Sequence, residues 1–347
     1  LDQTGYTKSD IGIIMSTFGF SSILLTPYTS VLIDKYGKKT LCFIALTLMI
    51  VSSLGFIFIS HFALIVLLRI IQGAAFSIFF NSSSAIASNN LDNDKKQIGL
   101  SFFSSFTIIS YILGPFFSEK IIIQFGFTEF FIYASMFSLM SLVLIWFVQE
   151  KDSEKDSTVN FLSFFRIIQE EKIFNCLFAN FLLASGFGVV MNFLSLFLKN
   201  NNLTVGYFFI SYSVVVSLVR IFFSDKFSSQ NLFNKILLML ILFAGTLFFI
   251  PYIDSKSDII LFSVLFSLTY SLVYPFLSSI VVAGKPQSLT GRLFGALNSS
   301  FSIGVNLMTF FYGFIAELWG FATMFQVASV LILLGVGFMF MKESKSI

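Results

Sequence analysis

Charged residues are scarce in this sequence: they make up 11% of its 347 residues, while hydrophobic residues make up 56%. An ordinary soluble domain carries about 25% charged and about 45–50% apolar residues, so the composition excludes that class. Cysteine and histidine are scarce too. Cys42 and Cys176 lie in different predicted helices without the spacing of a metal site. With one histidine, His61, the chain has too few acid–base groups for an enzyme, and we expect no metal and no cofactor.

A mean hydropathy of +0.90 predicts an integral membrane protein in contact with a lipid bilayer. Crossing about 30 Å of hydrocarbon takes roughly 20 helical residues, and eleven apolar runs are long enough. They are too long and too continuous for the strands of a β-barrel, so we expect an all-α membrane protein. The runs are residues 11–33, 41–60, 62–90, 97–118, 130–148, 173–198, 200–223, 236–253, 259–284, 293–316 and 318–341.

Basic residues are distributed unevenly between the loops that alternate along the chain. The loops that include residues 34–40 and the C-terminus hold fifteen lysines and arginines, and the other loops hold four. By the positive-inside rule the first set faces the cytoplasm, and Leu1 then lies outside. The residues after Leu1 do not form a signal peptide that would export it. We therefore expect one further transmembrane helix ahead of Leu1, twelve in all; a true eleven-helix protein is the alternative.

The longest polar segment, residues 149–172, predicts a cytoplasmic linker rich in charges of both signs. It separates an N-terminal half, residues 1–148, from a C-terminal half, residues 173–347. Five apolar runs precede the linker and six follow it. We expect two six-helix halves once the helix ahead of Leu1 is counted.

The two halves also resemble each other in sequence. GFTEFFIYAS at 126–135 is similar to GFATMFQVAS at 320–329, and Asp34-Lys35-Tyr36 is echoed by Asp225-Lys226-Phe227. Secondary transporters use such repeats to form pseudo-symmetric halves with a substrate path between them near the bilayer midplane. The repeat therefore favours transport over other membrane functions.

Arg69 is the one Asp, Glu, Lys or Arg between residues 41 and 90, and it lies roughly 12 Å of helix beyond the external turn at His61. An arginine at that depth costs at least about 2.5–3.5 kcal/mol, so it should face a polar interior and have a partner. As a functional group it would couple protons or gate a substrate. As a structural group it would pin helices together or reach toward the membrane surface.

The partner of Arg69 is open, because no Asp or Glu occurs inside any of the eleven apolar runs. A carboxylate ahead of Leu1 or one at an external helix end would serve, and an uncoupled protein is the third alternative. On the same helix, LLRIIQGAAF contains Gln72, which could hydrogen-bond to a neighbouring helix, and Gly73, which admits close packing. We group Arg69, Gln72 and Gly73 as candidate transport and coupling residues.

One Gly-Pro pair and one Tyr-Pro pair interrupt the apolar runs. Gly114-Pro115 lies near the external end of its run, and Tyr274-Pro275 lies near mid-membrane. Proline removes a helical hydrogen bond, so both pairs are candidate conformational hinges.

Four amides are candidates to line a polar cavity in the second half: Asn180, Asn192, Asn298 and Asn306. Each of them alone is more often a hydrogen-bonding contact between helices. Arg220, near the cytoplasmic end of its run, is expected to extend to the membrane interface.

The turn SVLIDKYGKK, residues 30–39, gathers four charges within six residues between two apolar runs. Its lysines fit the positive-inside rule, which does not account for Asp34 or Gly37. The helix dipole disfavours an aspartate at the C-terminal end of a helix, so we expect Asp34 to have a partner.

Together these motifs resemble the major facilitator superfamily over essentially the whole chain. The turn is similar to the family's signature Gly-x-x-x-Asp-Arg/Lys-x-Gly-Arg/Lys-Arg/Lys, with Ser30 in place of the first glycine. LLRIIQGAAF is similar to the helix-four motif, and TGRLFGALNSSFSIG and ELWGFATMF to the helix-eleven region and the turn after it. The matching signature residues are Asp34, Lys35, Gly37, Lys38 and Lys39. The resemblance implies that Asp34 helps to latch a cytoplasmic gate and that Gly37 permits the tight turn.

The family's helix-five antiporter motif, Gly-x-x-x-Gly-Pro-x-x-Gly-Gly, is kept in part. Gly114 and Pro115 match, Ser110 replaces the first glycine, and Ser118 and Glu119 replace the last two. In members that resemble drug:proton antiporters, helix one often supplies the acid near the helix-four arginine. The departures weaken the antiporter assignment without removing it.

The resemblance implies a secondary transporter that moves a small organic molecule by alternating access. The leading hypothesis is a proton-coupled efflux antiporter in a bacterial inner or plasma membrane, with a drug, sugar or metallophore-like substrate. Alternatives are an uptake symporter, a facilitator, or a membrane sensor that binds without transport. We expect a monomer that binds no nucleic acid.

Overall fold

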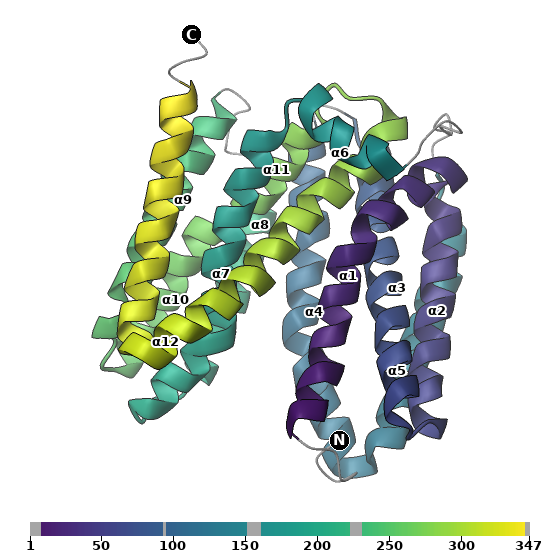
Figure 1. The fold of residues 1–347 in the computed structure, drawn as a ribbon, viewed down its shortest axis with the longest axis horizontal. Coiled ribbons are helices and arrows are strands. Elements are labelled where there is room, and N and C mark those ends of the chain that lie inside the picture. Colours follow the sequence, from purple (N-terminus) through teal and green to yellow (C-terminus); the bar gives the residue numbers. More distant parts are fainter. Residues whose placement is uncertain (1–7, 93–94, 151–160, 223–230, 344–347) are drawn as a thin grey trace. The chain divides into compact units, whose positions relative to one another are not determined.

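The computed structural model describes residues 8–92, 95–150, 161–222 and 231–343 (Figure 1). Every regular element within these residues is a helix. A polypeptide in lipid must satisfy its own backbone hydrogen bonds, and an α-helix does so within one segment. The expectation of an all-α membrane protein is confirmed.

Twelve α-helices and two short 3-10 helices make up the described part of the chain. In chain order they are α1 (Lys8–Tyr36), α2 (Lys38–Phe58), α3 (Phe62–Asn89), α4 (Lys96–Phe125), α5 (Phe127–Phe147), α6 (Phe161–Glu170), α7 (Phe174–Asn200), α8 (Gly206–Phe222), α9 (Leu232–Phe249), η3 (Ile250–Tyr252), α10 (Lys256–Tyr270), α11 (Val273–Val282), η4 (Gln287–Leu289) and α12 (Thr290–Glu343).

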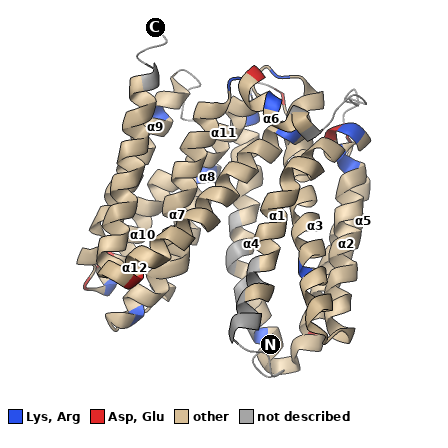
Figure 2. Ribbon diagram, viewed as in Figure 1, with Lys and Arg blue, Asp and Glu red and all other residues tan. Residues whose placement is uncertain are grey.

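Each of the eleven apolar runs overlaps at least one helix. The first five runs are α1 to α5 and the next three are α7 to α9. The run 259–284 is divided into α10 and α11, and the last two runs both lie in α12, which bends at Gly320 where φ is 82°. Within the described residues, seven helical segments are long and apolar enough to cross a membrane. The ribbon segments of charged residues lie mostly near helix ends, and most of the ribbon belongs to uncharged residues (Figure 2).

The linker contains a helix that the sequence analysis did not predict. In α6 the side chains of Phe164 and Ile167 are buried, whereas Leu162 and Phe165 are exposed. Residues 151–160 of the linker lie outside the described residues, as does the Asp225-Lys226-Phe227 echo. The division of the chain into halves 1–148 and 173–347 stays a prediction.

One compact unit comprises Leu1–Asp92, Leu113–Glu171 and Gly284–Ser299. Within it α1 packs on α3, α3 on α2, and α2 on α5, and α6 packs on α1. The short start of α12 belongs to this unit, so residues from both ends of the chain meet here.

A second compact unit comprises Asn93–Ile112, Lys172–Ala283 and Ser300–Ile347. Within it α10 packs on α8 and α9, and α11 packs on α7 and α9. Its interior is rich in aromatic rings: Phe266 contacts the rings of Phe208 and Phe243. The phenylalanine bias of the sequence therefore fills this core.

Candidate functional site

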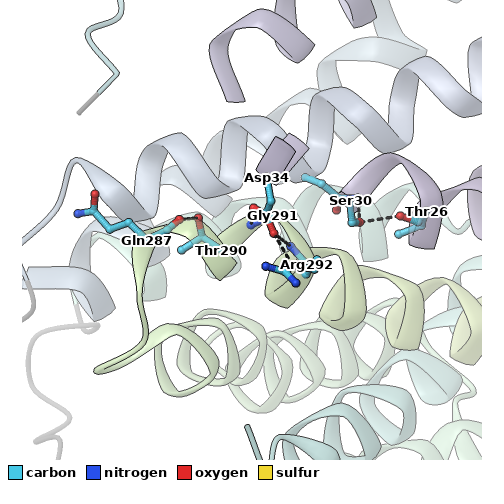
Figure 3. A network of polar contacts seen from close by, with 8 residues as sticks. Thr26, Ser30, Asp34, Gln287, Thr290, Gly291 and Arg292 are labelled. Carbon is cyan, nitrogen blue, oxygen red and sulfur yellow. Dashed lines mark hydrogen bonds and ion pairs between the residues drawn. The ribbon is translucent and has the colours of Figure 1, made fainter. Parts of the chain in front are cut away.

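The carboxylate of Asp34, near the end of α1, binds the first turn of α12 (Figure 3). Its Oδ1 accepts a hydrogen bond from the backbone N–H of Gly291 at 2.9 Å. Its Oδ2 accepts from the backbone N–H of Arg292 at 3.1 Å and from the Arg292 Nε at 2.9 Å. The first N–H groups of a helix lack partners within that helix, so Asp34 caps α12 from another part of the chain, 257 residues away.

This contact resolves the electrostatic problem posed by an aspartate at the C-terminal end of α1. The positive end of the α12 dipole and the Arg292 guanidinium both face the carboxylate. Asp34 has a fully buried side chain, and that of Arg292 is 6% exposed. Asp34 follows the apolar run 11–33, and burial raises the pKa of its carboxyl to about 6, although the charge of Arg292 acts in the opposite direction.

Small residues allow α1 and α12 to approach closely at this cap. A Cβ on Gly291 would lie 2.5 Å from Asp34 Oδ1, and a Cβ on Gly295 would overlap the hydroxyl of Ser30. Ser30 and Asp34 are four residues apart on α1, as Gly291 and Gly295 are on α12, so each pair lies on one helix face. A Cβ on Gly295 would also lie 3.2 Å from the ring of Phe164, which places α6 against the same contact. We call Asp34, Gly291 and Arg292 the α1–α12 latch.

The lysines of the turn take part in a second carboxylate cap. Gly37 joins α1 to α2 with φ of 101°, a conformation that favours glycine. The first N–H groups of α2, from Lys38 and Lys39, donate to Glu150 Oε1 and Oε2 at 2.9 and 3.1 Å. The Lys39 ammonium donates to the carbonyls that end α5, among them that of Val148 at 2.7 Å. Lysine and carboxylate thus satisfy a helix N-terminus and a helix C-terminus together.

Lys35 belongs to neither of these two caps. Its ammonium lies 5.4 Å from the centroid of the Tyr36 ring, a cation–π contact at the surface. Of the five signature residues, the structure thus brings Asp34 to α12 and Lys38 and Lys39 to the end of α5.

Buried hydrogen bonds also join α3 to α1 and to α12. The Ser77 hydroxyl bonds to the hydroxyls of Thr26 and Thr29 at 2.8 and 3.0 Å. Four residues further along α3, the Asn81 amide accepts from the amide of Asn298. Asn298 therefore meets a partner on α3, which the sequence analysis did not single out.

Arg69 lies on α3 with Gln72 and Gly73. Its NH1 donates to Gln72 Oε1 at 3.2 Å, and its guanidinium carbon lies 5.3 Å from the centroid of the Phe56 ring. A Cβ on Gly73 would lie 2.5 Å from the carbonyl oxygen of Phe18, so α1 approaches α3 closely at this glycine. An amide and an aromatic face therefore accompany the arginine on which the coupling hypothesis rests.

The other cavity candidates contact neighbouring helices or their own helix. Asn180 donates to Ser300 at 2.9 Å and Asn192 donates to Thr309 at 3.2 Å, so both join α7 to α12. Asn306 donates to the carbonyl one turn earlier in α12. Their role in a cavity stays a prediction.

The two hinge candidates lie in different settings. Helix α4 runs through Gly114 and Pro115, and a Cβ on Gly114 would meet nothing within 4 Å. Tyr274 and Pro275 lie in the first turn of α11, after the break between α10 and α11. Their role as hinges stays a prediction.

The expectation that Arg220 extends to the membrane interface is wrong. Its side chain is buried, with a relative exposure of 2%. The Nε donates to the carbonyl of Ser271 at 2.7 Å and NH1 donates to that of Ser104 at 2.8 Å. Carbonyls brought close by the tertiary fold satisfy the guanidinium internally, so it has no need of solvent.

Sequence reasoning missed four members of the site. Glu150 is the first acid after the run 130–148. Because it lies on the same side of the membrane as the lysines of residues 34–40, it could have been predicted as their partner. Gly291 and Gly295 repeat at the four-residue spacing typical of close helix contacts. Asn81 lies in the polar stretch NSSSAIASNN, which is unusual within an apolar run. In the described residues, no cluster of three His, Cys, Asp or Glu side chains could hold a metal ion.

Apolar helices of spanning length define an integral membrane protein. The chain aligns with the human organic anion transporter MFSD10 (TETRAN) with a TM-score of 0.80 and 18% identity, covering 94% of this chain and 82% of that one. It aligns with the Escherichia coli fucose:proton symporter FucP with a TM-score of 0.78 and 13% identity, covering 97% and 92%. At these identities the likeness concerns the fold alone.

The family model of the Major Facilitator Superfamily matches residues 1–309, and the chain belongs to this family of transporters. Curated relatives include the quinolone resistance protein NorA of Staphylococcus aureus, 28% identical over 33% of this chain and 30% of NorA. Another is the multi-drug resistance efflux pump PmrA of Streptococcus pneumoniae, 26% identical over 40% of this chain and 35% of PmrA. The matches span about a third of each relative's length.

Proposed function

We propose that the protein exports a small organic molecule from a bacterial cell in exchange for protons, by alternating access. The relatives with sequence similarity are named for drug resistance and efflux, which supports export. The lysine-rich turn and the other basic loops support a cytoplasmic location for the α1–α12 latch and for the C-terminus.

The observation that carries the proposal is the α1–α12 latch. A transporter that alternates between two states needs contacts that form in one state and break in the other. A buried carboxylate that caps a helix from a distant part of the chain suits this role, because all three hydrogen bonds are lost together when the helices separate. In the proposed cycle the latch closes the cytoplasmic side, and its release opens the path to substrate.

Proton coupling is assigned to the surroundings of Arg69. Its charge lies deep in α3 beside Gln72, and a cation there lowers the proton affinity of any carboxyl that approaches it. Gly73 allows α1 and α3 to pack closely, so that movement of one of these helices displaces the other. The pairs Gly114-Pro115 and Tyr274-Pro275 are assigned as hinges, and the four amides as lining of the substrate path.

Transport in proteoliposomes tests the proposal. A fluorescent quinolone antibiotic is the probe, and a pH gradient is imposed across the membrane. We expect the gradient to drive quinolone movement and Arg69→Ala to abolish the coupling. Arg166→Ala, at an exposed position on α6, is the control and should transport as the wild type does. Quinolone flux that ignores the pH gradient would refute the antiport mechanism.

The alternative is an uptake symporter or a facilitator with the same fold. Deletion in the source cell should raise the intracellular level of an exported substrate and lower that of an imported one. A membrane sensor would bind the probe without moving it. Light scattering of the detergent-solubilised protein tests the expectation of a monomer.

A further inference from the structure

Arg220 lies at the point where α10 gives way to α11, and the sequence of α11 explains why a cation is needed there. In an α-helix the N–H of residue i bonds to the carbonyl of residue i−4. The carbonyl of Ser271 would therefore accept from residue 275, which is proline and has no N–H. Hydrogen bonds form before and after the break: Ser271 N–H donates to the Ser267 carbonyl at 2.9 Å, and Phe276 N–H donates to the Leu272 carbonyl at 3.0 Å.

The guanidinium of Arg220 occupies the position of the missing donor. Its Nε donates to the Ser271 carbonyl at 2.7 Å, a short charge-assisted bond. Ser271 is also the residue that ends α10, where the helix dipole is negative and a cation is favoured. The sequence feature that breaks the helix and the buried arginine are thus two parts of one arrangement.

The same guanidinium also holds a third helix. NH1 donates to the carbonyl of Ser104 at 2.8 Å, on the part of α4 that belongs to the second unit. Because the fork of the guanidinium is planar and rigid, both carbonyls are fixed relative to α8. Among the described residues no carboxylate forms an ion pair with Arg220, so main-chain carbonyls are its identified hydrogen-bond acceptors.

We infer that Arg220 is a positioning residue that supplies the hydrogen bond Pro275 cannot make, and so fixes the broken helix α10–α11 against α8 and α4. It joins the two helices that carry the hinge candidates. If Arg220 released the Ser271 carbonyl, α11 would be free to tilt at the break. A helix with an N–H at residue 275 would not need the arginine.

Combining substitutions at the two positions tests the inference. Arg220→Met removes the guanidinium donors at nearly constant volume. Pro275→Ala restores a backbone N–H at residue 275 that can donate to the Ser271 carbonyl. Hydrogen exchange of the Ser271 and Phe276 amides, measured by mass spectrometry on the full chain in nanodiscs, reports opening at the break. We expect Arg220→Met alone to speed this exchange about tenfold to a hundredfold, the range for loss of a hydrogen bond to a charged group. In the Pro275→Ala background the same substitution should change it by less than about threefold.

Pro251→Ala is the matched control, because Pro251 lies in η3, directly after α9, and takes no part in the break between α10 and α11. In that background Arg220→Met should keep its full effect. Equal acceleration in the wild-type and Pro275→Ala backgrounds would overturn the inference and assign the cation to another task, such as binding a substrate anion.

Two further measurements keep the test decisive if Arg220→Met does not fold. Pro275→Ala should then restore its yield, whereas a double variant that still fails to fold contradicts the inference. Arg220→Lys, whose single nitrogen cannot span both carbonyls as the fork does, should give intermediate exchange in the wild-type background. Because exchange needs no substrate, failure of the proposed transport function leaves this test intact.

Discussion

Replacement of Asp34 by alanine should open the α1–α12 latch while leaving the protein in the membrane. The substitution removes three hydrogen bonds, two from the start of α12 and one from Arg292. It also leaves Arg292 buried without its counter-charge. Removing one partner of a buried ion pair costs about 3–5 kcal/mol. Since about 1.4 kcal/mol is a tenfold change, we expect the closed population to fall by at least about a hundredfold.

Exchange of the Gly291 and Arg292 amides measures this loss directly, because these are the two N–H groups that Asp34 accepts. Arg292→Gln is the comparison: it removes the guanidinium but keeps both backbone bonds to Asp34, and its effect on the Gly291 amide should be clearly smaller. Insertion is followed by the fluorescence of a C-terminal fusion, and turnover by quinolone flux in proteoliposomes.

Two results would refute the reasoning. If Asp34→Ala accelerated the Gly291 amide no more than Arg292→Gln does, the helix cap would contribute nothing beyond the ion pair. If exchange rose but turnover stayed normal, the latch would be a feature of the fold without a part in the transport cycle.

Three further outcomes follow from the same contacts. Gly295→Ala, whose Cβ would overlap Ser30, should lower the free energy of unfolding by about 1–3 kcal/mol in thermal melts. Gly337→Ala, whose Cβ would meet nothing within 4 Å, should raise it by up to about 1 kcal/mol. Equal melting temperatures of the two variants would contradict the close approach of α1 and α12 at Gly295. Burial raises the pKa of Asp34 to about 6 in the closed state, against 3.8 for an exposed aspartate, so the closed state holds a proton more tightly than the open state does. Lowering the pH from 7 to 5 should therefore favour the closed state in exchange measurements, and the opposite trend would show that Asp34 does not titrate in this way. Glu150→Gln, which removes the charge that caps α2, should cost about 1–2 kcal/mol in chemical unfolding, against less than about 0.5 kcal/mol for Glu170→Gln in an exposed pair; similar costs would show that the cap is not stabilising.

Much of the fold was predictable because the solvent is lipid. Hydrocarbon requires long apolar runs and backbone hydrogen bonds within each segment, so the run lengths, and the proline that follows the break between α10 and α11, are visible in the residues themselves. The helix in the linker was not predicted because its apolar residues form a short amphipathic pattern inside a charged segment. The further helix expected ahead of Leu1 stays a prediction.

The candidate site was predictable only in part. The turn around Asp34 was recognisable from its charges, and the dipole argument required a partner for the aspartate. That partner, the start of α12, is 257 residues away, and no local pattern specifies it. Gly291, Arg292 and Gly295 all lie in TGRLFGALNSSFSIG, the stretch that resembles the family, but their roles depend on the helix that packs against them.

Composition and run length are local properties, so the residues alone indicate the class of protein, the positions of the apolar runs and the residues that carry charge into them. Which groups satisfy those charges depends on how the helices pack. Arg220 shows the difference: by sequence it lies near the end of a run, where a long side chain usually reaches the interface. In the fold it meets a carbonyl left without a donor by Pro275 on another helix, and that pairing depends on packing between segments some fifty residues apart.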